Sequence, residues 1–160
     1  MNQTGTYVKI LRESLERKKR YLAEILTLTN KQAEYAAAEM FDEAAFSELV
    51  DKKEVLIGNI NEGDKGFASV YERVKQEIQA DPACYREDLQ AIQSLIRQCV
   101  DLGMQIEAVE ERNRAAMEQV FATKFQGVRQ IKQSKTVASK YYKSMANGMV
   151  NDSLLYDRKK

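Results

Sequence analysis

The sequence predicts an all-α protein: an elongated antiparallel bundle of about three long helices, coiled-coil-like, with a protruding or mobile C-terminal segment. Composition gives the first reason. Of the 160 residues one is Pro, seven are Gly, none is Trp and 31% are charged. Charged and straight-chain residues of this kind lose little rotamer freedom in a helix. The second reason is that apolar residues recur at steps of three and four in three successive segments, which is typical of one helix face.

The first segment, residues 6–38, carries an apolar stripe that includes Leu15 and Leu22. Asp42 follows it at a position suited to begin a second helix. A carboxylate there accepts hydrogen bonds from the free N–H groups of the first turn. We therefore expect a helix–helix connection before residue 42, with one continuous helix as the alternative.

The second segment, residues 42–80, contains three glycines between residues 58 and 66. Each Gly costs about 1 kcal/mol relative to Ala inside a helix. Because the apolar stripe resumes in near-register beyond them, we expect a weakened or bent helix rather than a loop. Pro82 ends this segment, since it lacks the N–H that a continuing helix needs, and Asp81 is expected to cap the next helix.

The third segment keeps helical spacing from Pro82 as far as Asn147 and Gly148, the first strong stop signal. One helix over that length would be about 95 Å long. Two shorter partners cannot bury its whole stripe, so part of it must protrude, pair with another chain or stay mobile until a partner arrives. Shared core layers are expected to contain Leu15, Leu22, Ile57, Ile96 and Ile106, with Cys99 packed on the same apolar face.

Charge is distributed unevenly along the chain. Residues 1–123 hold 16 Lys and Arg against 22 Asp and Glu, whereas residues 124–160 hold 9 against 2. A basic end is typical of a segment that binds phosphate groups. It is also typical of a solvated helix end whose cations complement the helix dipole. Its many Tyr, Met and Leu side chains favour a protein interface. We divide the chain into a bundle, residues 1–133, and an amphipathic partner-binding extension, residues 134–160. The predicted partner-binding residues are Val137, Tyr141, Tyr142, Met145, Met149, Leu154, Leu155 and Tyr156.

The absence of His from the sequence argues against an enzyme, because Ser-His-Asp, Cys-His and His-metal chemistry are all lost. No Gly-rich phosphate loop is present either. We therefore predict no catalytic, cofactor-binding or metal-binding residues. The nearest catalytic-looking cluster, residues 110–114, is interpreted as a solvated face with a Glu110–Arg114 ion pair and with Asn113 as a polar break in the stripe.

Two cysteines, Cys84 and Cys99, are too few for a disulfide scaffold. No apolar run approaches the roughly 18 residues that a membrane span needs. The first residues lack the basic and apolar regions of a signal peptide. These features predict a cytoplasmic protein without membrane insertion.

Five segments of the chain can be compared with a known family. They are residues 22–32 (LAEILTLTNKQ), 46–60 (FSELVDKKEVLIGNI), 109–114 (VEERNR), 134–143 (SKTVASKYYK) and 152–160 (DSLLYDRKK). Together these segments resemble the FlgN family of flagellar export chaperones. The likeness covers most of the chain, and its sharper parts are the Tyr-Tyr-Lys and the ending. One departure is the glycine-rich interval 58–66, where a continuous charged helix is more usual.

This resemblance implies a cytoplasmic chaperone of the flagellar type III secretion system. Such a protein binds hook-associated junction subunits before secretion, prevents their premature assembly and delivers them to the export apparatus, components of which are further candidate partners. It also implies that the end of the last helix binds the substrate. The alternatives are a non-flagellar helical adaptor or scaffold using the same surface, and a nucleic-acid-binding protein with a basic arm. Nucleic acid is not the expected partner, and a homodimer stays open.

Overall fold

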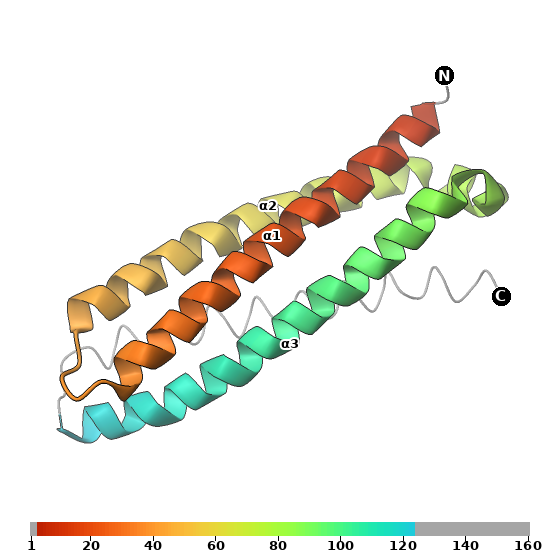
Figure 1. The fold of residues 1–160 in the computed structure, drawn as a ribbon. Coiled ribbons are helices and arrows are strands. Elements are labelled where there is room, and N and C mark those ends of the chain that lie inside the picture. Colours follow the sequence, from red (N-terminus) through yellow and green to blue (C-terminus); the bar gives the residue numbers. More distant parts are fainter. Residues whose placement is uncertain (1–2, 124–160) are drawn as a thin grey trace.

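The computed structural model describes residues 3–123, which form three long α-helices and one short 3-10 helix (Figure 1). The helices are α1 (Gln3–Ala37), α2 (Glu43–Ala80), η1 (Pro82–Tyr85) and α3 (Arg86–Thr123). Within that range only residues 38–42 and Asp81 lie outside a helix. The predicted all-α fold is confirmed for this part of the chain.

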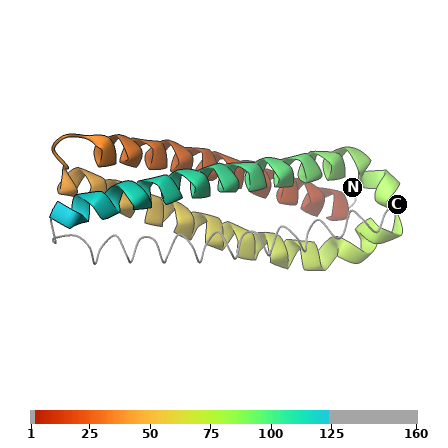
Figure 2. The same cartoon turned by 90° about the horizontal axis from the view of Figure 1, so that it is seen from below.

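The three long helices run antiparallel to their neighbours in sequence and form an elongated bundle (Figures 1 and 2). The central helix is α1, which packs along both α2 and α3. It is suited to that place because its buried residues recur at alternating steps of four and three, the spacing of a coiled-coil seam. These residues are Thr4, Val8, Leu11, Leu15, Lys18, Leu22, Ile25, Thr29, Gln32 and Ala36.

The main hydrophobic cluster draws side chains from all three helices. It contains the five residues expected in shared core layers, namely Leu15, Leu22, Ile57, Ile96 and Ile106. Cys99 is fully buried in the same cluster, as its place on the apolar face predicted. A second, smaller cluster joins Ala36, Phe46, Val50 and Met117 near the α1–α2 connection.

The start of α2 is fixed by two local interactions. The Asp42 carboxylate accepts a hydrogen bond from the Ala45 N–H at 3.0 Å, which confirms it as the N-cap. Phe41 and Phe46 pack with their ring centroids 5.4 Å apart. This contact between the residue before the cap and the fourth helical residue is a hydrophobic staple, which sets the angle at which the chain enters the helix. The chain therefore breaks at residues 38–42, and one continuous helix is excluded.

Two further boundary predictions have different outcomes. Helix α2 continues through Gly58, Gly63 and Gly66, so a helix rather than a loop is confirmed there. The Asp81 side chain makes no capping bond; instead its N–H donates to the Glu77 carbonyl at the end of α2, at 3.2 Å. Because Pro82 begins a turn of 3-10 helix, the long third helix starts at Arg86 and not at Pro82. Its predicted course beyond Thr123 lies outside the described residues.

Candidate functional site

The predicted partner-binding residues all lie outside the described residues, as does the predicted domain boundary at residues 133 and 134. The set is Val137, Tyr141, Tyr142, Met145, Met149, Leu154, Leu155 and Tyr156. Within residues 3–123, the candidate sites are polar groups buried in the bundle and a pocket between α1 and α2.

The most deeply buried charge is the ammonium of Lys53, a residue that is only 3% exposed. Its Nζ donates to the Gln32 side-chain oxygen at 2.7 Å and to the carboxylate of Glu110. The three partners come from α2, α1 and α3. Burial lowers the pKa of Lys53 below its ordinary value by disfavouring the charged form, and the nearby Glu110 opposes that shift. The ammonium of Lys53 thus depends on groups from both neighbouring helices.

Two more buried polar residues lie beside this ion pair. The Asn113 amide donates to the Thr29 carbonyl at 3.1 Å, and the Thr29 hydroxyl donates to the Ile25 carbonyl at 2.7 Å. Buried polar groups of this kind are normally hydrogen-bonded, because an unmade bond in the core costs the whole desolvation penalty. Asn113 is therefore a polar break in the apolar stripe, as predicted.

We call these five residues, Thr29, Gln32, Lys53, Glu110 and Asn113, the polar layer. On each helix they lie between the members of the two hydrophobic clusters. On α1, for example, the main cluster reaches Ile25 and the smaller cluster contains Ala36. The polar layer consequently divides the core into a long and a short part.

The Glu110–Arg114 ion pair expected from sequence is not formed. Glu110 pairs with Lys53, while Arg114 pairs with Glu111 at 2.6 Å and with Glu118 at 3.9 Å. The physical reason is that an unpaired charge costs much more free energy when it is a buried ammonium than when it is a guanidinium in contact with water. Lys53 was missed although the sequence carries its signal, since it stands seven residues from both Phe46 and Ile60 on the buried face.

A second buried cation occurs nearer the middle of α1. Lys18 is 7% exposed, and its Nζ lies 2.9 Å from the Asp64 carboxylate of α2. Lys18 stands seven residues from Leu11 and from Ile25, so it too occupies a core position of the heptad pattern. Sequence reasoning did not single out either partner.

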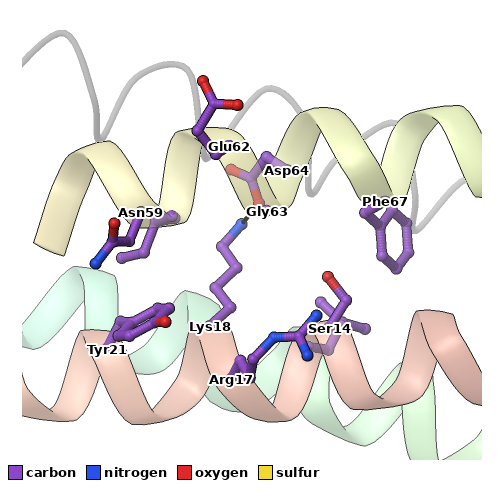
Figure 3. A pocket seen from close by; sticks show the side chains of 11 residues that line it. Ser14, Arg17, Lys18, Tyr21, Asn59, Glu62, Gly63, Asp64 and Phe67 are labelled. Atoms are coloured by element: carbon purple, nitrogen blue, oxygen red, sulfur yellow. Dashed lines mark ion pairs between the residues drawn. The ribbon is translucent and has the colours of Figure 1, made fainter.

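This ion pair lies in a pocket of about 380 Å³ between α1 and α2 (Figure 3). In that view the Lys18 side chain reaches from α1 to Asp64 on α2. Tyr21 and Asn59 lie on one side of it, and Arg17, Ser14 and Phe67 on the other. The lining residues are Ser14, Leu15, Arg17, Lys18, Tyr21, Asn59, Ile60, Glu62, Gly63, Asp64 and Phe67.

The two cysteines have different environments. Burial raises the pKa of the Cys99 thiol to about 11, while Cys84 is exposed; both are free thiols. In the described part of the chain, no three His, Cys, Asp or Glu side chains are grouped so that they could hold a metal ion. Among the helices described, none combines the length and apolar character needed to cross a membrane.

Comparison with known proteins finds no match to any protein-family model, curated protein or solved structure.

Proposed function

We propose that this protein is a FlgN-type export chaperone. It binds flagellar hook-associated junction subunits in the cytoplasm before secretion, prevents their premature assembly and aids their delivery to the export apparatus. The proposal assigns the chain no catalytic residue, metal or cofactor. Binding is assigned to the C-terminal extension, with Tyr141 and Tyr142 as its central anchors.

The observation that carries this proposal is the convergence of three segments that resemble the family. Residues 22–32 supply Thr29 and Gln32 to the polar layer, residues 46–60 supply Lys53, and residues 109–114 supply Glu110 and Asn113. The antiparallel packing of the three helices brings these segments to the same level of the bundle. The resemblance therefore covers residues that contact one another.

The charge distribution favours a protein partner over a nucleic acid. Residues 1–123 carry a net charge of −6, from 16 basic and 22 acidic residues. Nucleic-acid affinity comes largely from cations that displace counterions from phosphate, so an acidic body opposes it. A heptad-rich subunit segment can instead pack against an amphipathic helix, which orders the segment and hides its assembly surface.

The test compares two variants of the full chain in one binding assay with a purified hook-associated subunit. In the first, Tyr141 and Tyr142 are both replaced by Ala. We expect binding to be lost with little change in melting temperature, because an aromatic anchor commonly contributes about 2 kcal/mol or more.

In the second variant Lys132, Lys135, Lys140 and Lys143 are replaced by Gln. We expect a smaller effect, since charges at the rim of an interface mainly alter association rate and salt dependence. Repeating the assay at two salt concentrations separates the alternatives. If the C-terminal extension were a nucleic-acid-binding arm, binding would be lost in the lysine variant and at the higher salt concentration, but not in the tyrosine variant. That result would reject the chaperone assignment of this surface.

A further inference from the structure

The pocket between α1 and α2 exists because small residues interrupt two series of larger ones. On α1, half-buried residues spaced by seven are Tyr7, Ser14, Tyr21, Leu28 and Tyr35. On α2, a series with the same spacing is Leu49 and Leu56, which are buried, and Gly63 and Val70, which are half-buried. Ser14 and Gly63 both line the pocket. Apart from the adjoining residues and the backbone of its own helix turn, no heavy atom lies within 4 Å of the position that a Cβ on Gly63 would occupy. The space is therefore built into the sequence of both helices.

One cation at the pocket has no partner among the residues that the structure describes. Lys18 and Asp64 neutralise each other at 2.9 Å, and Glu62 lies 3.6 Å from Lys65. Arg17 forms neither an ion pair nor a hydrogen bond with any residue between 3 and 123, and the same holds for the Ser14 hydroxyl. The pocket is thus lined by two basic and two acidic residues, and the exposed Arg17 is the cation among them that pairs with no residue between 3 and 123.

An aromatic ring lies on the same side of the pocket as this cation. Figure 3 shows Phe67 on the side of the Lys18–Asp64 pair that also holds Arg17 and Ser14. Phe67 is half-buried and stacks on Tyr71 with ring centroids 6.4 Å apart. A guanidinium, a hydroxyl and an aromatic ring thus line the pocket on one side of the ion pair.

We propose that this pocket binds a small organic anion that carries an aromatic ring. Its carboxylate or sulfonate pairs with Arg17 and accepts a hydrogen bond from Ser14, while its ring packs against Phe67 in the space beside Gly63. Guanidinium groups bind oxyanions through charge-assisted hydrogen bonds, which favours an anionic ligand over a neutral one.

The dimensions of the pocket favour a small molecule over a partner helix. Its volume of about 380 Å³ lies within the range of roughly 300–1,000 Å³ that is usual for small-ligand sites. Tyr21 and Phe67 stand at opposite ends of the pocket (Figure 3). The space therefore suits one compact ligand better than a row of side chains. This site goes beyond the proposed chaperone function, and its test needs no export subunit.

The experiment uses two fluorescent probes that share their aromatic rings and differ in charge. One is 1-anilinonaphthalene-8-sulfonate, and the other is the neutral N-phenyl-1-naphthylamine. We expect the full-length protein to bind the sulfonate more tightly. Arg17→Gln should weaken sulfonate binding by about tenfold, the equivalent of one charge-assisted hydrogen bond, and leave the neutral probe unaffected.

Two glycines of α2 provide a matched pair of variants. Gly63→Leu should fill the pocket and remove the binding of both probes. Gly58→Leu should change neither, because Gly58 has the same open surroundings for an added Cβ but does not line the pocket. Ser14→Leu, which fills the pocket from α1, repeats the test if Gly63→Leu alters the melting temperature. Equal probe affinities in the Gly63 and Gly58 variants would overturn the proposal, as would unchanged sulfonate binding in Arg17→Gln or no binding by the unaltered protein.

Discussion

Lys53 shows at the scale of a single residue how this bundle tolerates a charge in its seam. It occupies a position that the heptad pattern assigns to apolar side chains, yet it is bonded to groups on both neighbouring helices. A buried ion pair adds little net stability, because desolvation offsets its attraction, but removing one partner leaves a costly buried charge. The bonds of Lys53 to Gln32 and Glu110 form in one alignment of the three helices. They therefore disfavour packings in which one helix is shifted along the others, as single polar residues do in coiled coils.

The first prediction follows from this dependence. Glu110→Ala should lower the free energy of unfolding by about 3 kcal/mol, the low end of the range for a broken buried pair, because the Glu110 side chain is 25% exposed. Replacing both Lys53 and Glu110 by Met should recover most of the loss. Urea unfolding at neutral pH measures both changes. A double variant no more stable than Glu110→Ala would contradict this account.

The second prediction concerns alkaline pH. Burial lowers the pKa of Lys53 in the folded state, so between that lowered pKa and 10.5 the unfolded chain binds more protons at this site. The free energy of unfolding contributed by Lys53 should therefore rise with pH through that window. The measurement is the stability difference between the unaltered protein and Lys53→Met at about pH 8 and about pH 10. From the lower to the higher pH, the free energy of unfolding of the unaltered protein should increase relative to that of Lys53→Met. A relative decrease would mean that the pKa of Lys53 is raised in the folded state.

The third prediction compares two apolar residues of different exposure. Ile96 is 3% exposed in the main cluster, whereas Val55 is 65% exposed. Ile96→Ala should cost about 2–5 kcal/mol, since it removes buried methyl groups and leaves a cavity. Val55→Ala should change stability by less than about 0.5 kcal/mol. Thermal or urea unfolding distinguishes them, and a cost below about 1 kcal/mol for Ile96→Ala would remove this residue from the core.

At the scale of the element, the three helices differ in how their sequences specify them. Helix α1 carries an almost unbroken heptad seam, and α2 begins at a side-chain cap with a hydrophobic staple. Yet α2 also contains three glycines at positions where an added Cβ would meet nothing within 4 Å. Local propensity is therefore weak between residues 58 and 66. Tertiary contacts of the stretch, including the Lys18–Asp64 pair, hold it in the helix.

This weakness supplies the fourth prediction. Gly58→Ala and Gly66→Ala should each raise the free energy of unfolding by about 0.5–1 kcal/mol, because alanine restricts the unfolded chain and suits the helix. The shift in urea midpoint measures the gain. A loss of stability would mean that one of these glycines is needed for a close approach that the open surroundings do not reveal.

At the scale of the whole molecule, the polar layer separates two hydrophobic clusters of unequal size. The larger spans most of the bundle, while the smaller is built on Ala36, Phe46, Val50 and Met117 beside the α1–α2 connection. Regions with fewer buried apolar contacts open at lower free energy than the global transition. The short end of the bundle is therefore expected to be the less stable part of the described chain.

Hydrogen exchange followed by mass spectrometry tests this fifth prediction. Amides of residues 92–106, which lie in the main cluster, should be the most protected. Amides near Phe46 and Met117, beyond the polar layer, should exchange faster through a local opening. Equal protection on both sides of the layer would mean that the two clusters unfold as one unit.

The sequence by itself determined the features that depend on near neighbours. The three helical segments, the Asp42 cap and the buried positions of Ile57, Ile96 and Cys99 all follow from helical spacing and local hydrogen bonding. Lys18 and Lys53 stand at the same heptad spacing as their apolar neighbours, but that spacing alone does not predict that a charged side chain is buried there.

Tertiary structure alone decided the pairing of these buried charges. Glu110 lies within reach of Arg114 on its own helix, but it bonds to Lys53, which is 57 residues away in sequence. The spacing of residues in the sequence indicates which groups share a helix face. It does not indicate which faces of different helices pack together, or how far water is excluded between them. The free energy of a charged group depends on how far water is excluded from it. The polar layer and the pocket beside Ser14 and Gly63 therefore follow from the packing of α1 against α2 and α3, and not from the sequence of any one helix.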